Sequence, residues 1–308
     1  MPVRVSVLAG AVPEQHYEHK VWRYRVFLPL MLVVAVYAQA KKRIAGKLGI
    51  KPKYNCFFVE GISESGRIVR DEATTWRALE AVYEFRNGVG TNAFFRAADR
   101  FYMNIRNAQA ARNRLCMAMR ALRAEIIMMH RDGLVAAGEP VRILSLAAGS
   151  ARGVIGVTKE MKDLGFPTRV FLIDTDPEAL AFAHRLAADY GISDEVSGAV
   201  EDVINFRFAI RTFKPDIVEM MGLTDYLSDQ LAIKLFKMIR IALKPDGFFF
   251  TSNVHPNSER YFLKHVVNWD MNYRTKDQLA SLFVKAGFSA PKVVSEPHGI
   301  QSFAYAQK

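Results

Sequence analysis

One stretch of eleven residues constrains the fold of this chain more than any other. It runs from Ile143 to Gly153 and reads ILSLAAGSARG, an apolar strand that passes directly into small residues. A second apolar strand, Val170–Asp174, ends in an acid 25 residues after Gly149. A strand, a small-residue turn, a helix and a second strand ending in a carboxylate form the half-site that holds a nucleoside in doubly wound sheets. The chain is therefore predicted to bind a nucleoside-containing ligand.

The rest of the carboxyl-terminal half alternates strands with helices. Further strands are expected at 196–204, 214–222 and 247–253, and helices at 178–190, 229–243 and 276–286. Asp176-Pro177-Glu178 is typical of a helix start, with proline in the first turn and acids near the positive end of the helix dipole. Two last strands, 291–296 and 301–307, flank Pro-His-Gly and predict a reversed hairpin. The expected fold class is α/β, with a doubly wound, mostly parallel seven-stranded sheet and an antiparallel C-terminal hairpin.

Taken in order, these motifs resemble those of class I S-adenosylmethionine-dependent methyltransferases. The resemblance rests on AAGSARG, IDTDP, VEDV, KPDIVEMMGLTDYL and LKPDGFFF, and it covers roughly Val141 to Lys308. Two positions depart from the family pattern, because Ala147 replaces the first glycine of the usual turn and Ser145 replaces an acid often found in the first strand. The segments RNAQAARNRL, GLTDYL and NWDMNYRT are also similar to a little-studied bacterial subgroup, some of whose relatives are linked to methyl esters of hydroxy fatty acids.

The resemblance implies that S-adenosylmethionine is the cofactor and which residues contact it. The turn after the first strand would lie against its amino-acid part, and Asp174 would take the ribose diol. Asp202 with the Val203 amide would meet the adenine edge, with Glu201 as the rival for that role and a solvated helix start as the alternative for the acid pair. The cofactor-binding residues predicted in this way are Ala147, Ala148, Gly149, Ser150, Asp174, Thr175, Glu201, Asp202, Val203 and Met221.

Catalytic candidates follow the carboxyl ends of the fourth and fifth strands, where sheets of this kind bind ligands. Methyl transfer requires an aligned acceptor, and orientation alone can supply about 7–11 kcal/mol. His255 is the best-placed general base by sequence, and a merely solvated loop histidine is the alternative. Tyr273 with Arg274 would suit an anionic acceptor. The predicted catalytic residues are His255, Tyr226, Tyr273 and Arg274.

Helices are also expected before the first strand, at 75–85 and 91–131. The stripe of Leu115, Met119, Leu122, Ile126 and Met129 is read as a core face. In the family that the motifs resemble, helices ahead of the first strand commonly form a lid over the acceptor pocket. The alternative for the segment Phe101–Arg114 is a solvated basic helix. The predicted substrate-binding residues are Tyr102, Arg106, Asn107, Asp225 and Trp269.

Charge divides the chain into two unequal parts. Residues 1–139 carry 22 Lys and Arg against 12 acids, whereas residues 140–308 carry 20 against 19. We therefore expect a basic helical lid and substrate region at 1–139 that faces an acidic partner, and a Rossmann-like catalytic domain at 140–308.

The basic part contains an uncharged run of 15 residues, Val26–Ala40. As a helix this run would be about 22 Å long, short of the roughly 30 Å of a bilayer core. Lys20, Arg23 and Arg25 precede it, and Lys41, Lys42 and Arg43 follow it. Three interpretations stay open: a buried helix, an interfacial anchor on an anionic membrane surface, and a true span.

Three classes of function are compatible with this pattern. We favour methyl transfer to a small-molecule acceptor, a carboxylate or lipid-like acid, by a cytoplasmic enzyme that is either free or peripheral at the inner membrane surface. A net charge of +11 also permits an RNA or other nucleic-acid methyltransferase, although no Asn/Asp-Pro-Pro-aromatic segment follows the fourth strand. A nicotinamide-dependent oxidoreductase or a non-catalytic nucleoside binder forms the third class. Cys56 and Cys116 lie far apart in sequence, so no metal site is expected.

Overall fold

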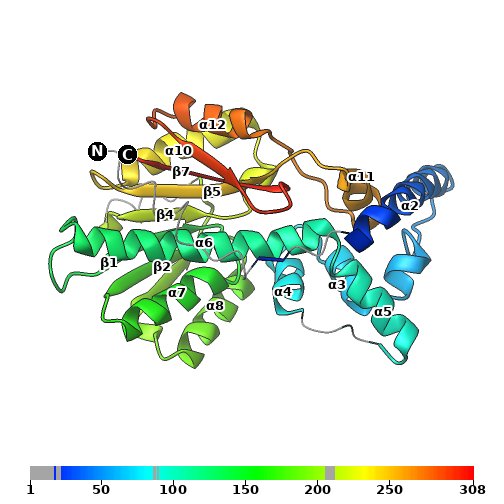
Figure 1. The fold of residues 1–308 in the computed structure, drawn as a ribbon, viewed down its shortest axis with the longest axis horizontal. Helices are drawn as coiled ribbons and strands as arrows, with labels where there is room; N and C mark the ends of the chain where they lie inside the picture. The colour runs from blue at the N-terminus through cyan, green and yellow to red at the C-terminus, as the bar shows by residue number, and fades with distance from the viewer. Residues whose placement is uncertain (1–16, 19–21, 86–87, 89, 205–211) are drawn as a thin grey trace.

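The computed structural model describes residues 17–18, 22–85, 88, 90–204 and 212–308 of the 308-residue chain (Figure 1). Its centre is a seven-stranded sheet in the order β3-β2-β1-β4-β5-β7-β6. The strands are β1 (Val141–Leu146), β2 (Thr168–Asp174), β3 (Val196–Val200), β4 (Ile217–Met220), β5 (Phe248–Val254), β6 (Lys292–Ser295) and β7 (Gln301–Gln307). Only β7 runs antiparallel to its neighbours, β5 and β6. The α/β fold and its C-terminal hairpin, both predicted from the sequence, are confirmed.

Helices cover both faces of this sheet (Figure 1). One face is covered by α7 (Arg152–Asp163), α8 (Pro177–Asp189) and the second half of α6 (Arg106–Arg131), the other by α10 (Asp229–Ala242) and α12 (Lys276–Lys285). On the first face the predicted stripe of α6 is core only in its second part, where Leu122, Ile126 and Met129 are buried; Leu115 and Met119 line the cavity described below. On the second face, the rings of Phe249 and Phe283 stack at 5.1 Å. The sheet is therefore a rigid platform whose carboxyl-terminal edge is free to carry a site.

Three predicted strands are shorter in the structure than in the sequence interpretation, and one of them, expected at 291–296, loses one residue at each end. The third strand of the chain was expected to reach residue 204 but ends at Val200, and Asp202 instead accepts a hydrogen bond from the Ile204 amide at 2.9 Å. A side chain that bonds its own backbone in this way competes with strand pairing. The fourth begins at Ile217 rather than 214, because Lys214 adopts a left-handed φ of 47° before Pro215.

The remaining helices pack at the carboxyl-terminal edge of the sheet and beyond it (Figure 1). They are α2 (Trp22–Lys47), η2 (Phe57–Gly61), α3 (Glu64–Asp71), α4 (Trp76–Glu84), α5 (Ala93–Tyr102), η4 (Thr224–Tyr226), α11 (Arg260–Phe262) and η5 (Leu263–Val267). The short helix η3 (Ser193–Glu195) instead directly precedes β3, at the amino-terminal edge of the sheet. The prediction of one helix over 91–131 is wrong, because α5 and α6 are separated at Met103–Ile105. Arg112 binds the Met103 carbonyl at 3.0 Å, and Gln109 binds that of Asn104 at 2.6 Å, so side chains replace the helical donors there.

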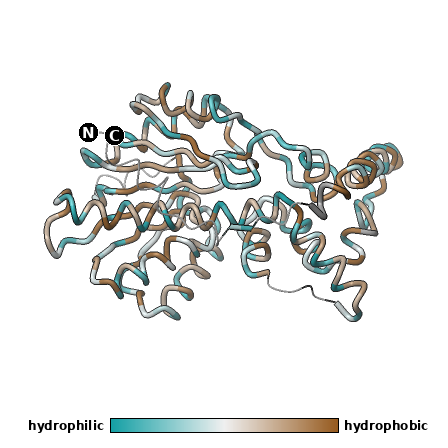
Figure 2. Tube along the Cα trace, viewed as in Figure 1, coloured by the Kyte–Doolittle hydropathy of each residue, from teal (hydrophilic) through white to brown (hydrophobic). Residues whose placement is uncertain are grey.

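The uncharged run Val26–Ala40 forms the middle of α2, which Figure 2 shows as largely hydrophobic. One side of α2 is buried and carries Met31, Ala35 and Ala38, whereas most of the larger apolar residues of the helix face outward. The interpretation as a fully buried helix is therefore wrong. None of the helices in the described ranges has the length and apolar character that a membrane span requires, so the interpretation as a span is wrong for these residues as well. Lys20 and the side chains of Arg23 and Arg25 lie outside the described part of the chain.

Candidate active site

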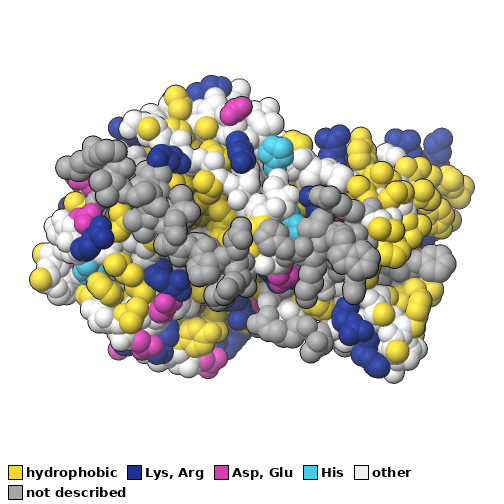
Figure 3. Space-filling view, viewed as in Figure 1, with side chains coloured by type: hydrophobic (Ala, Val, Ile, Leu, Met, Phe, Trp, Pro, Cys, Tyr) yellow, Lys and Arg dark blue, Asp and Glu magenta, His cyan; other side chains and the backbone are white. Residues whose placement is uncertain are grey.

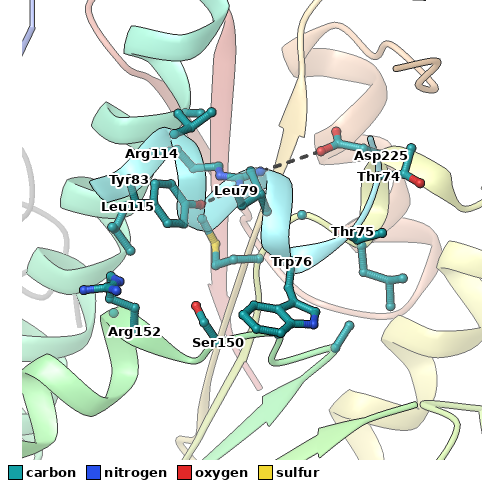
Figure 4. A pocket seen from close by; sticks show the side chains of 18 of the residues that line it. Thr74, Thr75, Trp76, Leu79, Tyr83, Arg114, Leu115, Ser150, Arg152 and Asp225 are labelled. Atoms are coloured by element: carbon teal, nitrogen blue, oxygen red, sulfur yellow. Dashed lines mark hydrogen bonds and ion pairs between the residues drawn. The ribbon is translucent and has the colours of Figure 1, made fainter. Parts of the chain in front are cut away.

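A cavity of about 420 Å³ opens at the carboxyl ends of β1, β2 and β4, beneath helices α4 and α6 (Figure 4). The turn after β1, the end of β2 and the loop after β4 form one side, and the helices that precede β1 form the other. Twelve of the predicted site residues line it: Tyr102, Asn107, Ala147, Ala148, Gly149, Ser150, Asp174, Thr175, Met221, Asp225, Tyr226 and Trp269. The cavity thus joins residues that were assigned to cofactor and to acceptor.

The turn after β1 is tight. Ala147, Gly149 and Ala151 all have a left-handed φ, of 51°, 54° and 49°. A side chain on Gly149 would place its Cβ 3.0 Å from the Cβ of Trp76 in α4. Ala147 takes this conformation although it carries a Cβ, which costs on the order of 1–2 kcal/mol. Alanine at the position of the missing first glycine thus takes the left-handed conformation that glycine adopts readily.

Asp174 connects the two turns that border the cavity. Its Oδ2 accepts a hydrogen bond from the Gly149 amide at 2.8 Å, and its Oδ1 accepts one from the Asp176 amide at 2.9 Å. A carboxylate offers about four lone-pair sites, so two acceptor positions are still open. This geometry suits a pair of neighbouring hydroxyls such as a ribose diol.

Helix α4 is bonded directly to these turns. Glu80 accepts hydrogen bonds from the Ser150 hydroxyl at 2.5 Å and from Arg152 at 2.6 and 2.8 Å. Trp76 donates from Nε1 to Asp176 at 2.8 Å. Neither Trp76 nor Glu80 was predicted as a site residue, and a helix 70 residues before the turn gives no local indication of these contacts. The helices before β1 therefore close over the turn residues.

A buried carboxylate compensates for the missing acid of the first strand. Glu219 of β4 lies in register with Ser145 of β1 and accepts the hydrogen bond of its hydroxyl. Glu219 also lines the cavity, and burial raises its pKa to about 7. The acid expected in β1 is thus supplied by the neighbouring strand. The sequence analysis did not identify Glu219, because strand pairing across 74 residues has no local signature.

The end of the cavity that Asp225 and Tyr226 line contains a buried arginine that was not predicted from the sequence. Arg114 of α6 lies between Tyr83 and Asp225 (Figure 4), and its Nη2 donates to the Tyr83 hydroxyl at 2.8 Å. Its Nη1 is 3.9 Å from Asp225 Oδ2, which is an ion-pair distance but too long for a hydrogen bond. The guanidinium is also close to the backbone of Gly222, where an added Cβ would lie 3.3 Å from Nη1.

Asp225 and Tyr226 were predicted, and both face this end of the cavity. Burial raises the pKa of Asp225 to about 6, although the Arg114 charge and a hydrogen bond from the Val254 amide lower it in part. The Tyr226 hydroxyl accepts from Trp269 Nε1 at 2.5 Å, and burial raises the Tyr226 pKa above its ordinary value. A guanidinium, a carboxylate and a phenol therefore converge within an otherwise apolar space.

Three of the four predicted catalytic residues lie elsewhere. Arg274 does not line the cavity, because its guanidinium is fully used by Asp229, Asn253 and the carbonyls of Thr224 and Leu227, at 2.6–2.9 Å. It fastens the loop after β4 to β5, so its assignment to an anionic acceptor is corrected to a structural one. His255 also lies off the cavity, with Nδ1 3.0 Å from the Pro256 carbonyl. Tyr273 has a buried hydroxyl with no hydrogen-bond partner among the described residues.

Of the predicted lid residues, Arg106 does not reach the cavity. Its Nη2 donates to the His298 carbonyl at 3.0 Å, while the amides of Arg106 and Asn107 donate to Glu259 at 3.1 and 2.9 Å. A carboxylate at this position satisfies the free amides of the first turn of α6. The prediction for Arg106 is therefore corrected: it helps to hold the start of α6.

The residues predicted to meet adenine follow β3. The Glu201 amide donates to the Asp174 carbonyl at 2.9 Å, which keeps this segment beside the end of β2. Glu201, Asp202 and Val203 do not line the cavity, and the chain from 205 to 211 lies outside the described residues. The adenine contact stays a prediction. In the part of the chain that the structure describes, no three His, Cys, Asp or Glu side chains are grouped as metal ligands.

A family model described as "Putative methyltransferase" matches residues 60–308. In fold, the chain is similar to a solved structure described as a possible exported protein from Bordetella parapertussis, with a TM-score of 0.68, 19% identity, and coverage of 96% of this chain and 99% of that one. It is also similar to magnesium protoporphyrin IX methyltransferase from Synechocystis PCC 6803 with bound S-adenosylhomocysteine, at TM-score 0.51, 13% identity, and 79% and 99% coverage.

The citrinin polyketide synthase CMeT domain is a further structural neighbour, at TM-score 0.53, 14% identity, and 81% and 66% coverage. At these identities the neighbours establish the fold. The curated proteins include no significant match to the sequence. Because the family model covers well over half of the chain, this protein belongs to that methyltransferase family, and it shares the fold of a methyltransferase solved with bound S-adenosylhomocysteine.

Proposed function

We propose that this enzyme methylates a small, largely apolar acceptor that carries a carboxylate. The observation that carries the proposal is Arg114, a guanidinium buried in the cavity whose Nη1 makes no hydrogen bond to the adjacent Asp225. Planar guanidinium groups bind carboxylates through paired hydrogen bonds. The side chains that line the cavity are mostly apolar and include Met103, Ile105, Leu263, Val267 and Met271. An acceptor with an apolar body and one acidic end matches this lining.

The other end of the cavity fits S-adenosylmethionine. Asp174 would accept hydrogen bonds from the ribose hydroxyls with its remaining lone pairs, and the turn at 147–150 would lie against the amino-acid part. Glu219 would face the positively charged part of the cofactor, because its carboxylate is buried at the floor of the cavity between β1 and β4. When bound, the cofactor supplies an activated methyl group on a positively charged sulfur.

The chain's own residues then have three tasks: to hold the acceptor oxygen, to align it, and to exclude water. Arg114, supported by Tyr83, would hold the carboxylate, while Tyr226 and Trp269 bound the space beside it. A carboxylate acceptor is already deprotonated near neutral pH, so the reaction needs no general base. This removes the need for His255, which lies off the cavity.

The helices before β1 would form the lid over this site. Glu80 and Trp76 bind α4 to the turn residues, and α6 contributes Arg114 from its first half. The second half of α6 packs into the core of the sheet, so the proposed lid and the catalytic part share one rigid helix. A lid that closes in this way would exclude water from the transfer.

The direct test is transfer of an isotopically labelled methyl group. Purified protein is incubated with S-adenosylmethionine labelled in its methyl group and with matched sets of fatty acids, aromatic acids, the corresponding alcohols and bulk RNA. We expect labelled methyl esters by mass spectrometry from the acids and no labelled ether from the matched alcohols. Label in the alcohols or in RNA, with none in the acids, would contradict the proposal.

The role of Glu219 predicts a pH dependence of cofactor binding. Because burial raises the Glu219 pKa to about 7, the carboxylate becomes negatively charged as the pH rises through neutrality. A sulfonium ligand prefers the charged carboxylate, so the Kd for S-adenosylmethionine should fall by up to about fourfold between about pH 6.5 and about pH 8. Calorimetric titration across this range measures the change. The whole range lies above the pKa of Asp225, which is about 6.

Two controls separate this effect from others. S-adenosylhomocysteine lacks the sulfonium charge, so its Kd should change less over the same pH range. In Glu219→Gln the pH dependence for S-adenosylmethionine should disappear while the uncharged hydrogen bond to Ser145 can persist. Identical pH profiles for the wild type and Glu219→Gln would remove Glu219 from the cofactor site.

A further inference from the structure

Helix α2 carries its large apolar side chains on its outer side. Its inner side consists of smaller residues, Met31, Ala35, Ala38 and Ala45, which are buried. The exposed apolar residues on the outer side are Val26, Leu30, Leu32, Val33, Val36, Tyr37 and Ile44. Figure 3 shows hydrophobic side chains gathered over α2, with Lys and Arg beside them. This arrangement is the reverse of the usual pattern for a helix at a protein surface.

The exposed face is broad. Successive residues of a helix are turned by about 100° around its axis, so the exposed apolar residues cover an arc of about 160°, with Leu32 at one edge and Leu30 at the other. The contact between two paired helices is a much narrower stripe. Val33 and Val36, in the middle of this arc, are 65% and 66% exposed. A face of this width fits an extended apolar layer better than a single partner helix.

The positive charge around this face disfavours packing of α2 against the same helix of a second copy of the chain. From Trp22 to Val59 the chain has eight Lys and Arg and no Asp or Glu. Two α2 helices packed in parallel would align the cluster Lys41–Arg43 with its own copy, and antiparallel packing would likewise bring together two segments that each carry a net positive charge. Both arrangements bring like charges together. An anionic surface would instead neutralise these cations, and Arg43, Lys47 and Lys51 are exposed toward solvent.

We propose that α2 docks on an anionic lipid bilayer, lying in the headgroup region with its outer apolar face inserted. Helices of this kind combine an apolar face that enters the acyl boundary with cations that meet lipid phosphates. The apolar run supplies the first element, and the cations at the carboxyl-terminal end of α2 supply the second. Of the interpretations left open by the sequence, this one alone matches both the outward side chains and the charge.

The inner side of α2 packs in an apolar cluster that reaches the cavity. Met31, Ala35 and Ala38 belong to the same apolar cluster as Tyr102, Leu263 and Val267, and the latter three line the cavity. This link rests on the proposed function: an acceptor with an apolar body would meet the enzyme at the bilayer to which α2 binds. Docking itself does not depend on the identity of the acceptor.

Co-sedimentation of the full chain with vesicles tests the docking surface. We expect binding to vesicles of phosphatidylcholine with phosphatidylglycerol, weaker binding to phosphatidylcholine alone, and weakening by salt. Val33→Glu with Val36→Glu places two acids on the exposed face, where no core packing is lost, and should lower the bound fraction tenfold or more. Ile241→Glu is the matched control, because Ile241 of α10 is 76% exposed on another surface; its binding should equal that of the wild type.

Affinity for S-adenosylhomocysteine, measured on the same preparations, reports whether each variant is folded. Vesicle binding that is absent in the wild type, or equal in the wild type and the Val33→Glu/Val36→Glu variant, would overturn the proposal. A wild-type dimer in sedimentation analysis that this variant converts to monomer, without vesicle binding, would assign the face to a second copy instead. If vesicle binding holds while no carboxylate is methylated, the proposed function fails and the docking surface stands.

Discussion

Replacing Asp174 with alanine is expected to weaken the binding of both S-adenosylmethionine and S-adenosylhomocysteine on the order of 100-fold, since charged hydrogen bonds contribute about 1.5–3 kcal/mol each. The carboxylate has two tasks in this site. It holds the amides of Gly149 and Asp176 at 2.8 and 2.9 Å, and its free lone pairs face the position proposed for the ribose. Alanine removes both, so the loss should exceed that of a single hydrogen bond. Isothermal titration calorimetry measures it for each ligand.

Two variants control for other causes of this loss. Asp174→Asn keeps the shape of the side chain but replaces one acceptor oxygen with a donor, so its affinity should lie between those of the wild type and Asp174→Ala. Asp189→Asn removes a carboxylate that is exposed at the end of α8 and should leave both affinities unchanged. If Asp174→Ala bound both ligands as the wild type does, the cofactor would have to lie elsewhere on the sheet.

The cofactor half of this site could be predicted because its determinants are local in sequence. The turn at 147–150 and the acid at Asp174 directly follow apolar strands, and parallel strands bring their carboxyl ends to one edge. The start of α8 could also be predicted from the sequence, since Asp176 caps the helix and Pro177 occupies its first turn. In each of these cases, neighbouring residues determine the geometry.

The acceptor half depends on contacts between distant segments, which a sequence alone does not reveal. Arg114 and Arg274 both stand among polar and aromatic residues, and the sequence analysis chose Arg274 as the anion ligand. In the structure the carbonyls of Thr224 and Leu227 occupy Arg274, while the packing of α6 turns Arg114 into the cavity. The separation of α5 from α6 sets that orientation, and it arises from side-chain bonds to Met103 and Asn104 that no helical periodicity reports.

The pairing of Ser145 with Glu219 shows the same limit in another form. A search along β1 finds the family's acid missing, and only the register between β1 and β4 shows that the neighbouring strand supplies a carboxylate there. The apolar run of α2 was also visible in the sequence, yet its orientation depended on which side packs against η5. Composition identified each feature, but tertiary packing decided what each one faces.

Replacing Arg114 with glutamine should lower kcat for a carboxylate acceptor by about 100-fold to 1,000-fold, the range observed when one oriented donor is removed from a reacting oxygen. The Arg114 guanidinium is the buried cation that Tyr83 orients toward the acceptor end of the cavity. Glutamine loses the charge and the paired donors, so the acceptor oxygen is no longer held behind the methyl group. Affinity for S-adenosylhomocysteine should change little, because the proposed cofactor contacts lie on the turns after β1 and β2.

Two comparisons show whether the effect comes from the acceptor end. Arg114→Lys keeps the charge but loses the planar fork, so it should recover part of the rate. Arg131→Gln removes an exposed arginine from the far end of the same helix and should leave the rate unchanged. Because burial already raises the pKa of Asp225 to about 6, the loss of Arg114 favours its neutral form and limits the cost of an unpaired charge. An unchanged kcat in Arg114→Gln, with ester still formed, would mean that another group holds the acceptor.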